Sequence, residues 1–402
     1  MENPAIEFSA RQRWRVLARI NLLSALSQVV QIGTITPLLS LSMQRMGHAP
    51  EVIGLVVSAS WLAIVLLYRM VPRLLMLLGL PGAVMISAAL TVVAVLGMSV
   101  SHSPMLLFAL NFMLGVGLIL RWIASDTWIV LVAQKNQRGR AIGIHETLMG
   151  LGIALGPLLL SLFGVDNALA YYAGAGLAGA SGIVGWSLRA AAVRPGARRS
   201  KSPWRVVRRI PLALCAAFIA GYGETSAVTF LASYALTAGY LLGLATLLLS
   251  AFGAGGTVLQ LPIGWVADRS AYKTAQLFCA VLLVAGALLI ALWAHTPWLA
   301  ALMVFVWGGA IGGMNTLAVI EAGDRVEEHQ LSTAMTAIAL CYTLGSIAGP
   351  IATGAAIGAI GDQGLVVSVG VAGVLFVVLL MVFGGSPKVL HRASAKSPPN
   401  GQ

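Results

Sequence analysis

The sequence predicts an all-α integral membrane protein in which twelve transmembrane helices form two six-helix bundles related by a pseudo-twofold axis. Of the 402 residues, 58% are hydrophobic and only 9% are charged, against about a quarter charged in a soluble domain. The 45 glycines are typical of helices that approach one another closely in lipid. Long apolar runs recur along the whole chain. This composition excludes a soluble enzyme, a disordered chain and a disulfide scaffold.

Twelve apolar runs are each long enough to cross a bilayer, since its hydrocarbon core takes about 20 residues of helix. The runs are 17–42, 51–70, 74–99, 104–132, 141–163, 169–188, 210–235, 241–266, 274–294, 298–320, 332–357 and 365–384. The break between the second and third runs is short, so this pair is the most prone to merge into one helix. Twelve crossings place both chain ends on the same side of the membrane.

The basic residues indicate which side that is. All but two of the 25 Lys and Arg residues lie in the chain ends or in the loops on that same side. The exceptions are Arg45 in an outer loop and Arg121 inside a run. We therefore expect a bacterial inner membrane protein with both termini in the cytoplasm. The net charge of +12 then points to anionic lipid headgroups as neighbours, and nucleic acid is not expected as a partner.

A long basic connection divides the chain into two related halves. The expected domains are a cytoplasmic N-terminal segment 1–16, an N-terminal six-helix bundle 17–188, a basic linker 189–209, a C-terminal six-helix bundle 210–384 and a cytoplasmic tail 385–402. The fifth run ends in Gly152-x-x-x-Gly156-Pro157, and the eleventh ends in Gly345-x-x-x-Gly349-Pro350. This match indicates a repeat. Transporters built from repeats bind their substrate near the membrane midplane, between the repeats.

Two motifs make the chain resemble the major facilitator superfamily of transporters over nearly its whole length. In the loop after the eighth run, Gly264, Asp268, Arg269 and Lys273 fill most of the family's inner-loop motif. In the fifth run, Gly143, Gly152, Gly156 and Pro157 resemble part of the motif found in the family's antiporters. Residues 326–350, with Trp122 and Asp126, resemble a poorly characterised bacterial branch. The resemblance implies gating roles for these motifs and for Gly349-Pro350, and a monomeric protein.

The chain departs from the family at two positions. Met76 and Leu77 occupy the first-half copy of the inner-loop motif, where the family has Asp and Arg. Asn111 stands where the family commonly has an Arg ahead of Gly-x-Gly. An Asn side chain carries no charge, so the family's proton-relay role is not expected at that position.

Charged residues inside the runs identify the candidate site, because each costs roughly 2.5–3.5 kcal/mol at the bilayer centre on insertion scales. At a rise of 1.5 Å per residue, Arg121, Glu224 and Gln31 all lie about 20 Å from the inner surface. We predict that Arg121 and Glu224 face each other across a central cavity. Protonation of Glu224 would then release Arg121 to hold an anionic or polar substrate. The alternative is a structural ion pair that locks the two bundles together.

Two further acids, Asp126 and Glu146, lie at similar depths near the inner surface. One interpretation has them share a proton in coupling. The other, slightly favoured, has them pair with Arg138 or Arg140. His145 is expected at the membrane interface rather than as a proton carrier. The acids that follow the tenth run, Glu321, Asp324, Glu327 and Glu328, are expected to form the solvated inner end of that helix.

Polar side chains predict the cavity wall. Steps of three, four and three residues place Asn21, Ser24, Gln28 and Gln31 on one face of the first helix. The remaining candidates are Asn111, Tyr222, Ser226, Thr229, Trp307 and Asn315. Amides, hydroxyls and aromatic rings suit a small polar organic solute better than a bare ion. Hydrogen bonding between helices is the alternative for the stripe on the first helix.

The sequence contains no phosphate-binding loop, no metal-ligand spacing and no nucleophile elbow. An enzyme is therefore not expected, no cofactor is expected, and an ion gradient remains as the energy source. The sequence predicts a secondary active transporter that works by alternating access, with proton-coupled export as the preferred direction. Proton-coupled import and a transport-inactive membrane receptor or assembly factor are the alternatives.

Overall fold

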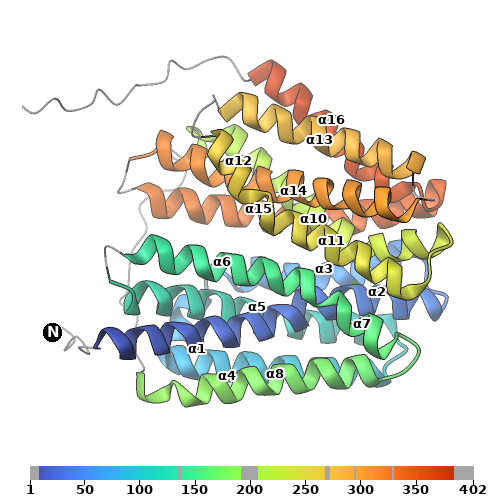
Figure 1. Ribbon diagram of the computed structural model, residues 1–402. Coiled ribbons are helices and arrows are strands. Elements are labelled where there is room, and N and C mark those ends of the chain that lie inside the picture. Colours follow the sequence, from blue (N-terminus) through green and yellow to red (C-terminus); the bar gives the residue numbers. More distant parts are fainter. Residues whose placement is uncertain are drawn as a thin grey trace, which may run out of the picture.

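The helices run parallel or antiparallel to one another through the whole length of the molecule (Figure 1). The computed structural model describes residues 9–134, 137–191, 207–267, 272–293, 296–327 and 330–383. In the N-terminal half the helices are α1 (Ala10–Gln28), the π-helical η1 (Val29–Thr34), α2 (Ile35–Arg45), α3 (Pro50–Leu67), α4 (Val71–Val100), α5 (Pro104–Val132), α6 (Arg138–Leu155), α7 (Pro157–Phe163) and α8 (Leu169–Ser187). A 3₁₀ turn, η3 (Arg189–Ala191), follows. In the C-terminal half they are α10 (Pro211–Thr237), α11 (Leu242–Val258), α12 (Gln260–Ala267), α13 (Tyr272–Trp293), α14 (Pro297–Arg325), α15 (Leu331–Ile360) and α16 (Gly364–Phe383).

The predicted twelve crossings are confirmed. α1, η1 and α2 form one continuous crossing, as do α6 with α7 and α11 with α12. Within the described ranges, eleven helical segments are long and apolar enough to span a membrane. The twelfth, α8, has 19 residues and is rich in Ala and Gly. The second and third runs stay separate, because α3 ends at Leu67 and α4 begins at Val71.

The helical boundaries differ from the prediction at the N-terminus. α1 begins at Ala10, inside the segment expected to precede the membrane, because Ser9 and Gln12 form a capping box. Most of the basic linker, residues 192–206, and the tail from 384 onward lie outside the described residues.

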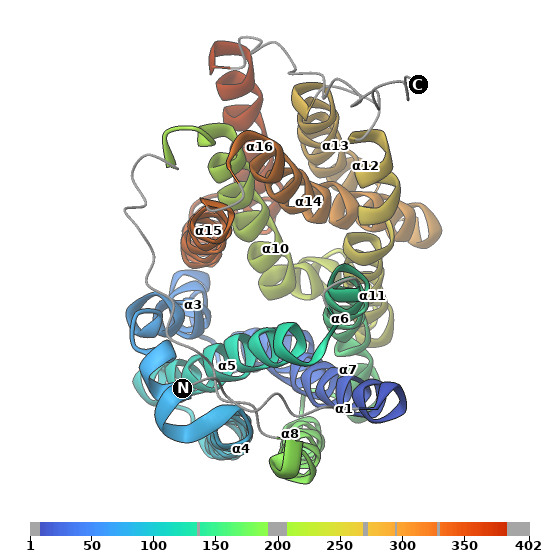
Figure 2. The ribbon, with the colours of Figure 1, turned by 90° about the vertical axis from the view of Figure 1, so that its left-hand side faces the viewer.

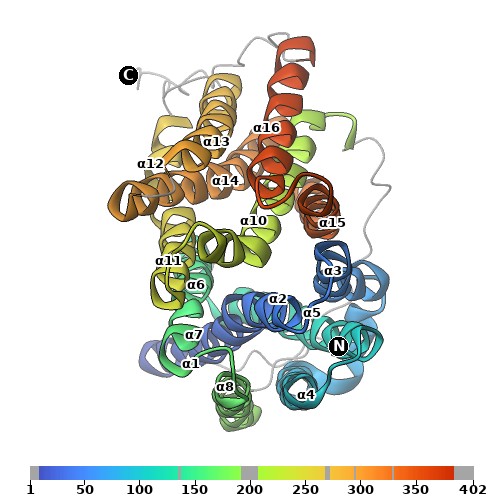
Figure 3. The ribbon, with the colours of Figure 1, turned by 90° about the vertical axis from the view of Figure 1, so that its right-hand side faces the viewer.

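The helices group into the two predicted bundles (Figures 2 and 3). α1 to α8 pack with one another, and α10 to α16 form the second group. Three seams join them: α3 packs on α15, α6 and α7 pack on α11, and α2 packs on α10. Near the outer ends of these helices, Ser233 of α10 donates a hydrogen bond to Gln44 of α2 at 2.7 Å.

The two Gly-Pro motifs make equivalent contacts in the two bundles, as the repeat predicts. A methyl group at Gly156, between α6 and α7, would overlap the backbone of Gly33 in η1. Likewise, a methyl group at Gly349 in α15 would overlap the backbone of Tyr222 in α10. In each bundle the fifth helix therefore packs backbone to backbone on the first, which only Gly permits.

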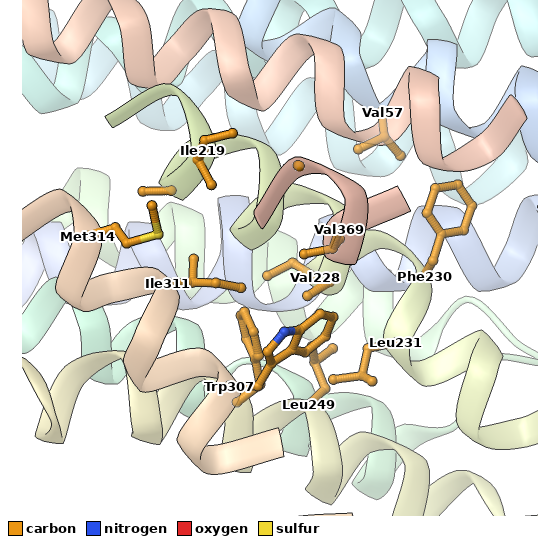
Figure 4. Packing of buried hydrophobic residues seen from close by; sticks show 14 of the residues in the cluster. Val57, Ile219, Val228, Phe230, Leu231, Leu249, Trp307, Ile311, Met314 and Val369 are labelled. Atoms are coloured by element: carbon orange, nitrogen blue, oxygen red, sulfur yellow. The ribbon is translucent and has the colours of Figure 1, made fainter. Parts of the chain in front are cut away.

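The apolar core lies inside each bundle and extends across the seams. In the C-terminal bundle it surrounds Trp307, which is fully buried and lies among Val228, Leu231 and Leu249 (Figure 4). The indole nitrogen of Trp307 donates to the Leu283 carbonyl at 3.1 Å. Trp307 was predicted to line the cavity, and this prediction is wrong because its ring fills the core.

Candidate functional site

The inner half of the polar stripe on α1 holds helices together. The Oδ1 atom of Asn21 lies 2.8 Å from Nδ1 of His145 in α6. Ser24 donates to Ser125 of α5 at 2.8 Å. All four side chains are buried. For these positions the structure favours hydrogen bonding between helices over a cavity wall.

The outer half of the stripe holds a buried cation. Arg121 of α5 is 2% exposed, and its guanidinium donates to Oε1 of Gln28 at 2.8 Å and to Oε1 of Gln31 at 3.2 Å. Gln31 in turn donates to Thr91 of α4 at 2.8 Å. A third guanidinium contact reaches the Met149 sulfur of α6 at 3.6 Å. Two amide oxygens and a thioether thus hold the charge inside the N-terminal bundle.

Gln31 lies in the π-helical segment η1, where the helix is locally widened. The hydroxyl of Thr34 donates to the carbonyls of Val29 at 2.8 Å and of Gly156 at 3.0 Å. Such π-helical segments inside α-helices are frequent at functional sites. Here the widened turn places Gln31 against Arg121.

The predicted contact between Arg121 and Glu224 is not formed. None of the ion pairs between described residues joins them. Gln28 and Gln31 reach the guanidinium from the neighbouring helix of the same bundle, whereas Glu224 belongs to the other bundle. There its carboxyl group interacts with the hydroxyl of Tyr342 in α15.

Glu224 lines a small cavity between the bundles. Its volume is about 40 Å³, which suffices for a water molecule, whereas small-molecule sites enclose about 300–1,000 Å³. The wall consists of Gly150, Ile153, Glu224, Phe252, Gly253, Gly256, Thr257, Gln260, Gly308, Ile311 and Gly312. In this arrangement of the bundles the cavity is therefore too small for an organic solute.

Arg121 and Glu224 lie on either side of one segment of α6. Met149 contacts Arg121, and the next residue, Gly150, lines the cavity together with Glu224. Arg121 in one bundle and Glu224 in the other therefore flank the same turn of α6. The two charged side chains form no ion pair with each other.

His145 is buried, not interfacial as expected from the sequence. It is 2% exposed, and its Nε2 lies 3.4 Å from Oδ1 of Asp126. The side chain of Asp126 is 44% exposed, and Glu146 is exposed as well. Neither acid forms an ion pair with Arg138 or Arg140 in the described part of the chain. The expected pairing of Asp126 and Glu146 with Arg138 or Arg140 is therefore wrong, because His145 approaches Asp126 instead.

The hydroxyl groups predicted on α10 are engaged inside the C-terminal bundle. Ser226 is hydrogen-bonded to Thr353 at 2.9 Å, and Tyr222 lies 2.5 Å from Ser368. Thr353 and Ser368 are 3.0 Å apart and close the network. The half-buried ring of Tyr222 remains the accessible part of this group.

Other predicted wall residues lie elsewhere. Asn111 is buried between α5 and α3, where its amide donates to the carbonyls of Val56 at 2.8 Å and Val57 at 3.0 Å. Thr229 is fully buried and donates to Thr225 of its own helix at 2.6 Å. Asn315 is half-buried on α14. Asn111 and Thr229 therefore serve packing rather than a cavity wall in this structure.

The inner-loop motif is described only in part. Gly264 has open space around it, and Lys273 is exposed at the start of α13. Asp268 and Arg269 lie outside the described residues.

A buried carboxylate corrects the expectation for the acids after the tenth run. Glu321 is 1% exposed, and its Oε2 accepts a hydrogen bond from Gln276 of α13 at 2.8 Å. Its Oε1 lies 2.9 Å from the guanidinium of Arg325, one turn further along α14. Packing of α14 against α13 encloses this carboxylate, so it is not solvated.

Sequence reasoning missed Met149, Gln260 and Tyr342. The signal for Tyr342 was available, since it is a Tyr within an apolar run and precedes the Gly345-x-x-x-Gly349-Pro350 motif. Among the described residues, no group of three or more His, Cys, Asp or Glu could hold a metal ion.

Comparison with known proteins identifies relatives over most of the chain. The family model of the Major Facilitator Superfamily matches residues 22–350 and, in a second match, 213–400. The uncharacterized MFS-type transporter YfkF of Bacillus subtilis (strain 168) is 25% identical over 358 residues, which cover 86% of this chain and 88% of the relative. The uncharacterized MFS-type transporter YcaD of Escherichia coli (strain K12 / DH10B) is 25% identical over 288 residues, covering 70% and 73%.

Solved structures share the fold. A mutant of the nucleoside transporter NupG superposes with a TM-score of 0.80 at 16% identity, covering 92% of this chain and all of that one. A bacterial homologue of the human lysosomal transporter Spinster, in an inward-facing and occupied conformation, gives a TM-score of 0.71 at 16% identity, covering 93% of this chain and 96% of that one. At these identities the likeness concerns the fold alone.

Proposed function

Since the chain belongs to the major facilitator superfamily, we propose that it exports a small polar organic solute across the bacterial inner membrane in exchange for protons. The family assignment makes the chain a multi-pass membrane transporter of the secondary kind, not an enzyme. An ion gradient is then the energy source, and no cofactor takes part.

One observation carries the proposal. A buried cation, Arg121, and a carboxyl group at the cavity, Glu224, flank the same turn of α6 from opposite bundles. In a transporter built from two repeats this is the place where substrate binds. A charged side chain at such a depth is costly unless it has a function or a partner.

In the proposed cycle Arg121 binds the substrate. Its guanidinium already donates to the amide oxygens of Gln28 and Gln31, and a carboxylate, phosphate or carbonyl of a solute can accept in their place. Charge-assisted bonds of this kind are roughly twice as strong as neutral ones. The two glutamines then gain free amide groups that can bind polar atoms of the solute.

Glu224 binds the proton in the same cycle. Its carboxyl group faces the cavity between the bundles, so it is reached when the bundles separate on either side. The described residues that line this cavity from α6, α11, α12 and α14 carry no ionisable side chain. Proton release on the inner side would accompany substrate entry there, which couples the two fluxes in opposite directions.

Export is the direction that the sequence supports, through the partial antiporter motif Gly152, Gly156 and Pro157. In the structure, Gly156 brings α6 against η1, next to Gln31. Asp126 of α5 and Glu146 of α6, near the inner ends of their helices, are proposed as auxiliary proton acceptors on the path from the cytoplasm.

The proposed orientation places both termini in the cytoplasm and the protein as a monomer among anionic headgroups. Two Arg–Trp contacts at the inner helix ends support it: Arg140 lies 5.8 Å from the Trp14 ring centroid, and Arg189 lies 4.1 Å from that of Trp186. Arg and Trp together are typical of the cytoplasmic membrane interface.

The test is a ligand screen by thermal unfolding of the purified protein. The compounds are sugars, amino acids, organic acids, siderophore-like chelators and cationic drugs. Nucleosides are added because NupG, which shares the fold, is a nucleoside transporter. We expect one class to raise the melting temperature of the wild type but not of Arg121→Ala or Glu224→Gln.

The control variant is Thr229→Val, because Thr229 lies on the same helix as Glu224 but bonds only within it. It should respond to the ligand like the wild type. A ligand that stabilises all four proteins equally would move the site elsewhere. If no compound stabilises the wild type, the result favours the alternative of a transport-inactive receptor or assembly factor.

A further inference from the structure

Three contacts at steps of seven residues, from Gly54 to Tyr68, mark the seam between α3 and α15 from its outer to its inner end. Near the outer end, Gly54 meets the backbone of Pro350 without space for a side chain. In the middle, the rings of Trp61 and Tyr342 pack edge to face, with centroids 5.9 Å apart and planes at 67°. At the inner end, the Tyr68 hydroxyl donates to Thr336 at 3.2 Å. The middle contact therefore lies where one bundle would pivot against the other.

Tyr342 differs from the other seam residues because its hydroxyl interacts with the carboxyl group of Glu224. Its ring packs against both large apolar clusters, of which one extends through both bundles and the other lies in the N-terminal bundle. The Ser346 hydroxyl, one turn along α15, donates to the backbone carbonyl of Tyr342 at 3.0 Å. A single side chain thus joins the carboxyl group of Glu224 to the interface with the opposite bundle.

Protonation changes what Glu224 offers to Tyr342. An ionised carboxylate accepts a charge-assisted hydrogen bond from the Tyr342 hydroxyl, and this bond is roughly twice as strong as a neutral one. A protonated carboxyl group is neutral and has a proton of its own to donate. Binding a proton therefore weakens the interaction between Glu224 of α10 and the Tyr342 hydroxyl. The Tyr342 ring can then change its contact with Trp61.

Few other groups compete for this role. The faces of α6, α11, α12 and α14 that line the cavity beside Glu224 present Gly, Ile, Phe, Thr and Gln side chains. From α15, Tyr342 is the ionisable partner of Glu224. Arg121 contacts Met149, Gln28 and Gln31 instead.

We propose that Tyr342 is the positioning residue that transmits the protonation of Glu224 to the α3–α15 seam and so moves one bundle against the other. This inference rests on the proposed function, in which Glu224 is the proton-binding group. It adds the residue that converts proton binding into movement.

The experiment measures how far apart the bundles lie. Distances between pairs of spin labels are obtained by double electron–electron resonance in nanodiscs at pH 8 and pH 5, without any substrate. The three native cysteines, which are free, are first replaced by alanine. Labels at Met105 and Trp298, 85% and 86% exposed, report on the outer ends. Labels at Leu77 and Leu261, both 81% exposed, report on the inner ends. We expect the outer and inner distances of the otherwise unchanged protein to shift in opposite senses with pH.

Three variants separate the steps. Glu224→Gln should lose the pH response, and Tyr342→Phe should lose it too, since it keeps the ring and removes only the hydroxyl. Tyr68→Phe is the matched control, because it removes a hydroxyl from the same seam that does not contact Glu224. It should keep the response. Trp61→Leu removes the ring on α3 that packs against Tyr342, and it should also lose the pH response.

The outcomes distinguish the two proposals. If Glu224→Gln loses the response and Tyr342→Phe keeps it, the role of Tyr342 is refuted and proton binding at Glu224 stands. If Tyr68→Phe loses it as Tyr342→Phe does, the seam is generally fragile and the specific role of Tyr342 is refuted. If Glu224→Gln responds like the unchanged protein, or that protein does not respond at all, both proposals fail.

Discussion

The guanidinium of Arg121 donates a hydrogen bond to the amide oxygen of Gln28 at 2.8 Å, from α5 to α1. A cation that is 2% exposed is thereby held by neutral oxygens rather than by a carboxylate. Amide oxygens stabilise a buried charge less than an ion pair does. The arrangement leaves the positive charge free to attract an acceptor group of a solute.

Arg121→Lys should weaken ligand binding at least tenfold while the protein still folds. Lys keeps the charge but lacks the planar fork that reaches Gln28 and Gln31 together, and a lost hydrogen bond to a charged group is worth about 1.5–3 kcal/mol. The measurement is isothermal titration with a compound from the screen. Arg45→Lys is the matched control, because Arg45 pairs with Asp166 near the outer end of α2, and it should bind normally. Equal affinities in both variants would remove Arg121 from the site.

Gly156→Ala should destabilise the protein by roughly 1–3 kcal/mol, as overpacking does, because the added methyl group overlaps the Gly33 backbone. Gly143→Ala, in the same helix and the same motif, meets nothing within 4 Å. It should be neutral or slightly stabilising, since Ala is the better helix former. Thermal unfolding in one detergent compares them, and a Gly156→Ala variant as stable as Gly143→Ala would refute the close helix contact.

Asn21 and His145 should be energetically coupled. Either single change to Ala leaves a buried polar atom unpaired at the 2.8 Å contact, at a cost of about 1–3 kcal/mol. The double variant should cost less than the sum of the singles, with a coupling of about 0.5–3 kcal/mol. Unfolding free energies of the four proteins measure this cycle. Strict additivity would show that the contact contributes nothing.

A cysteine pair at Ser161 and Gly243 should lock the outer end of the seam between α7 and α11. A Cβ atom at Gly243 would lie 3.5 Å from the Ser161 hydroxyl oxygen, within the reach of a disulfide. In a background without the native cysteines, oxidation should abolish transport and reduction should restore it. Transport that continues after complete cross-linking would mean that this seam does not open.

The positions of the helices follow from the sequence because apolar length and basic flanks are local properties. The repeat was also predictable, since the Gly-Pro motifs at 156–157 and 349–350 mark the same helix contact twice. The helix positions and the repeat depend on the apolar length of each helix and on close contacts between helix backbones. Neither depends on which side chains contact each other.

The partners of the buried polar groups were not predictable from depth alone. Depth placed Arg121, Gln31 and Glu224 at one level, but the rotation of each helix decides whether Arg121 meets Gln31 or Glu224. The π-helical turn at Val29–Thr34 changes that rotation locally and leaves no clear trace in the sequence. For the same reason His145 was expected at the membrane interface, while packing of α6 on α1 buries it.

In the proposed function Glu224 couples solute movement to a proton. Its most direct test is solute flux in proteoliposomes, with a compound that stabilises the wild-type protein. Two fluxes are compared for wild type and Glu224→Gln: exchange of labelled for unlabelled solute without a gradient, and accumulation driven by a pH gradient. We expect Glu224→Gln to keep exchange and to lose gradient-driven accumulation. Accumulation by Glu224→Gln at the wild-type level would contradict it.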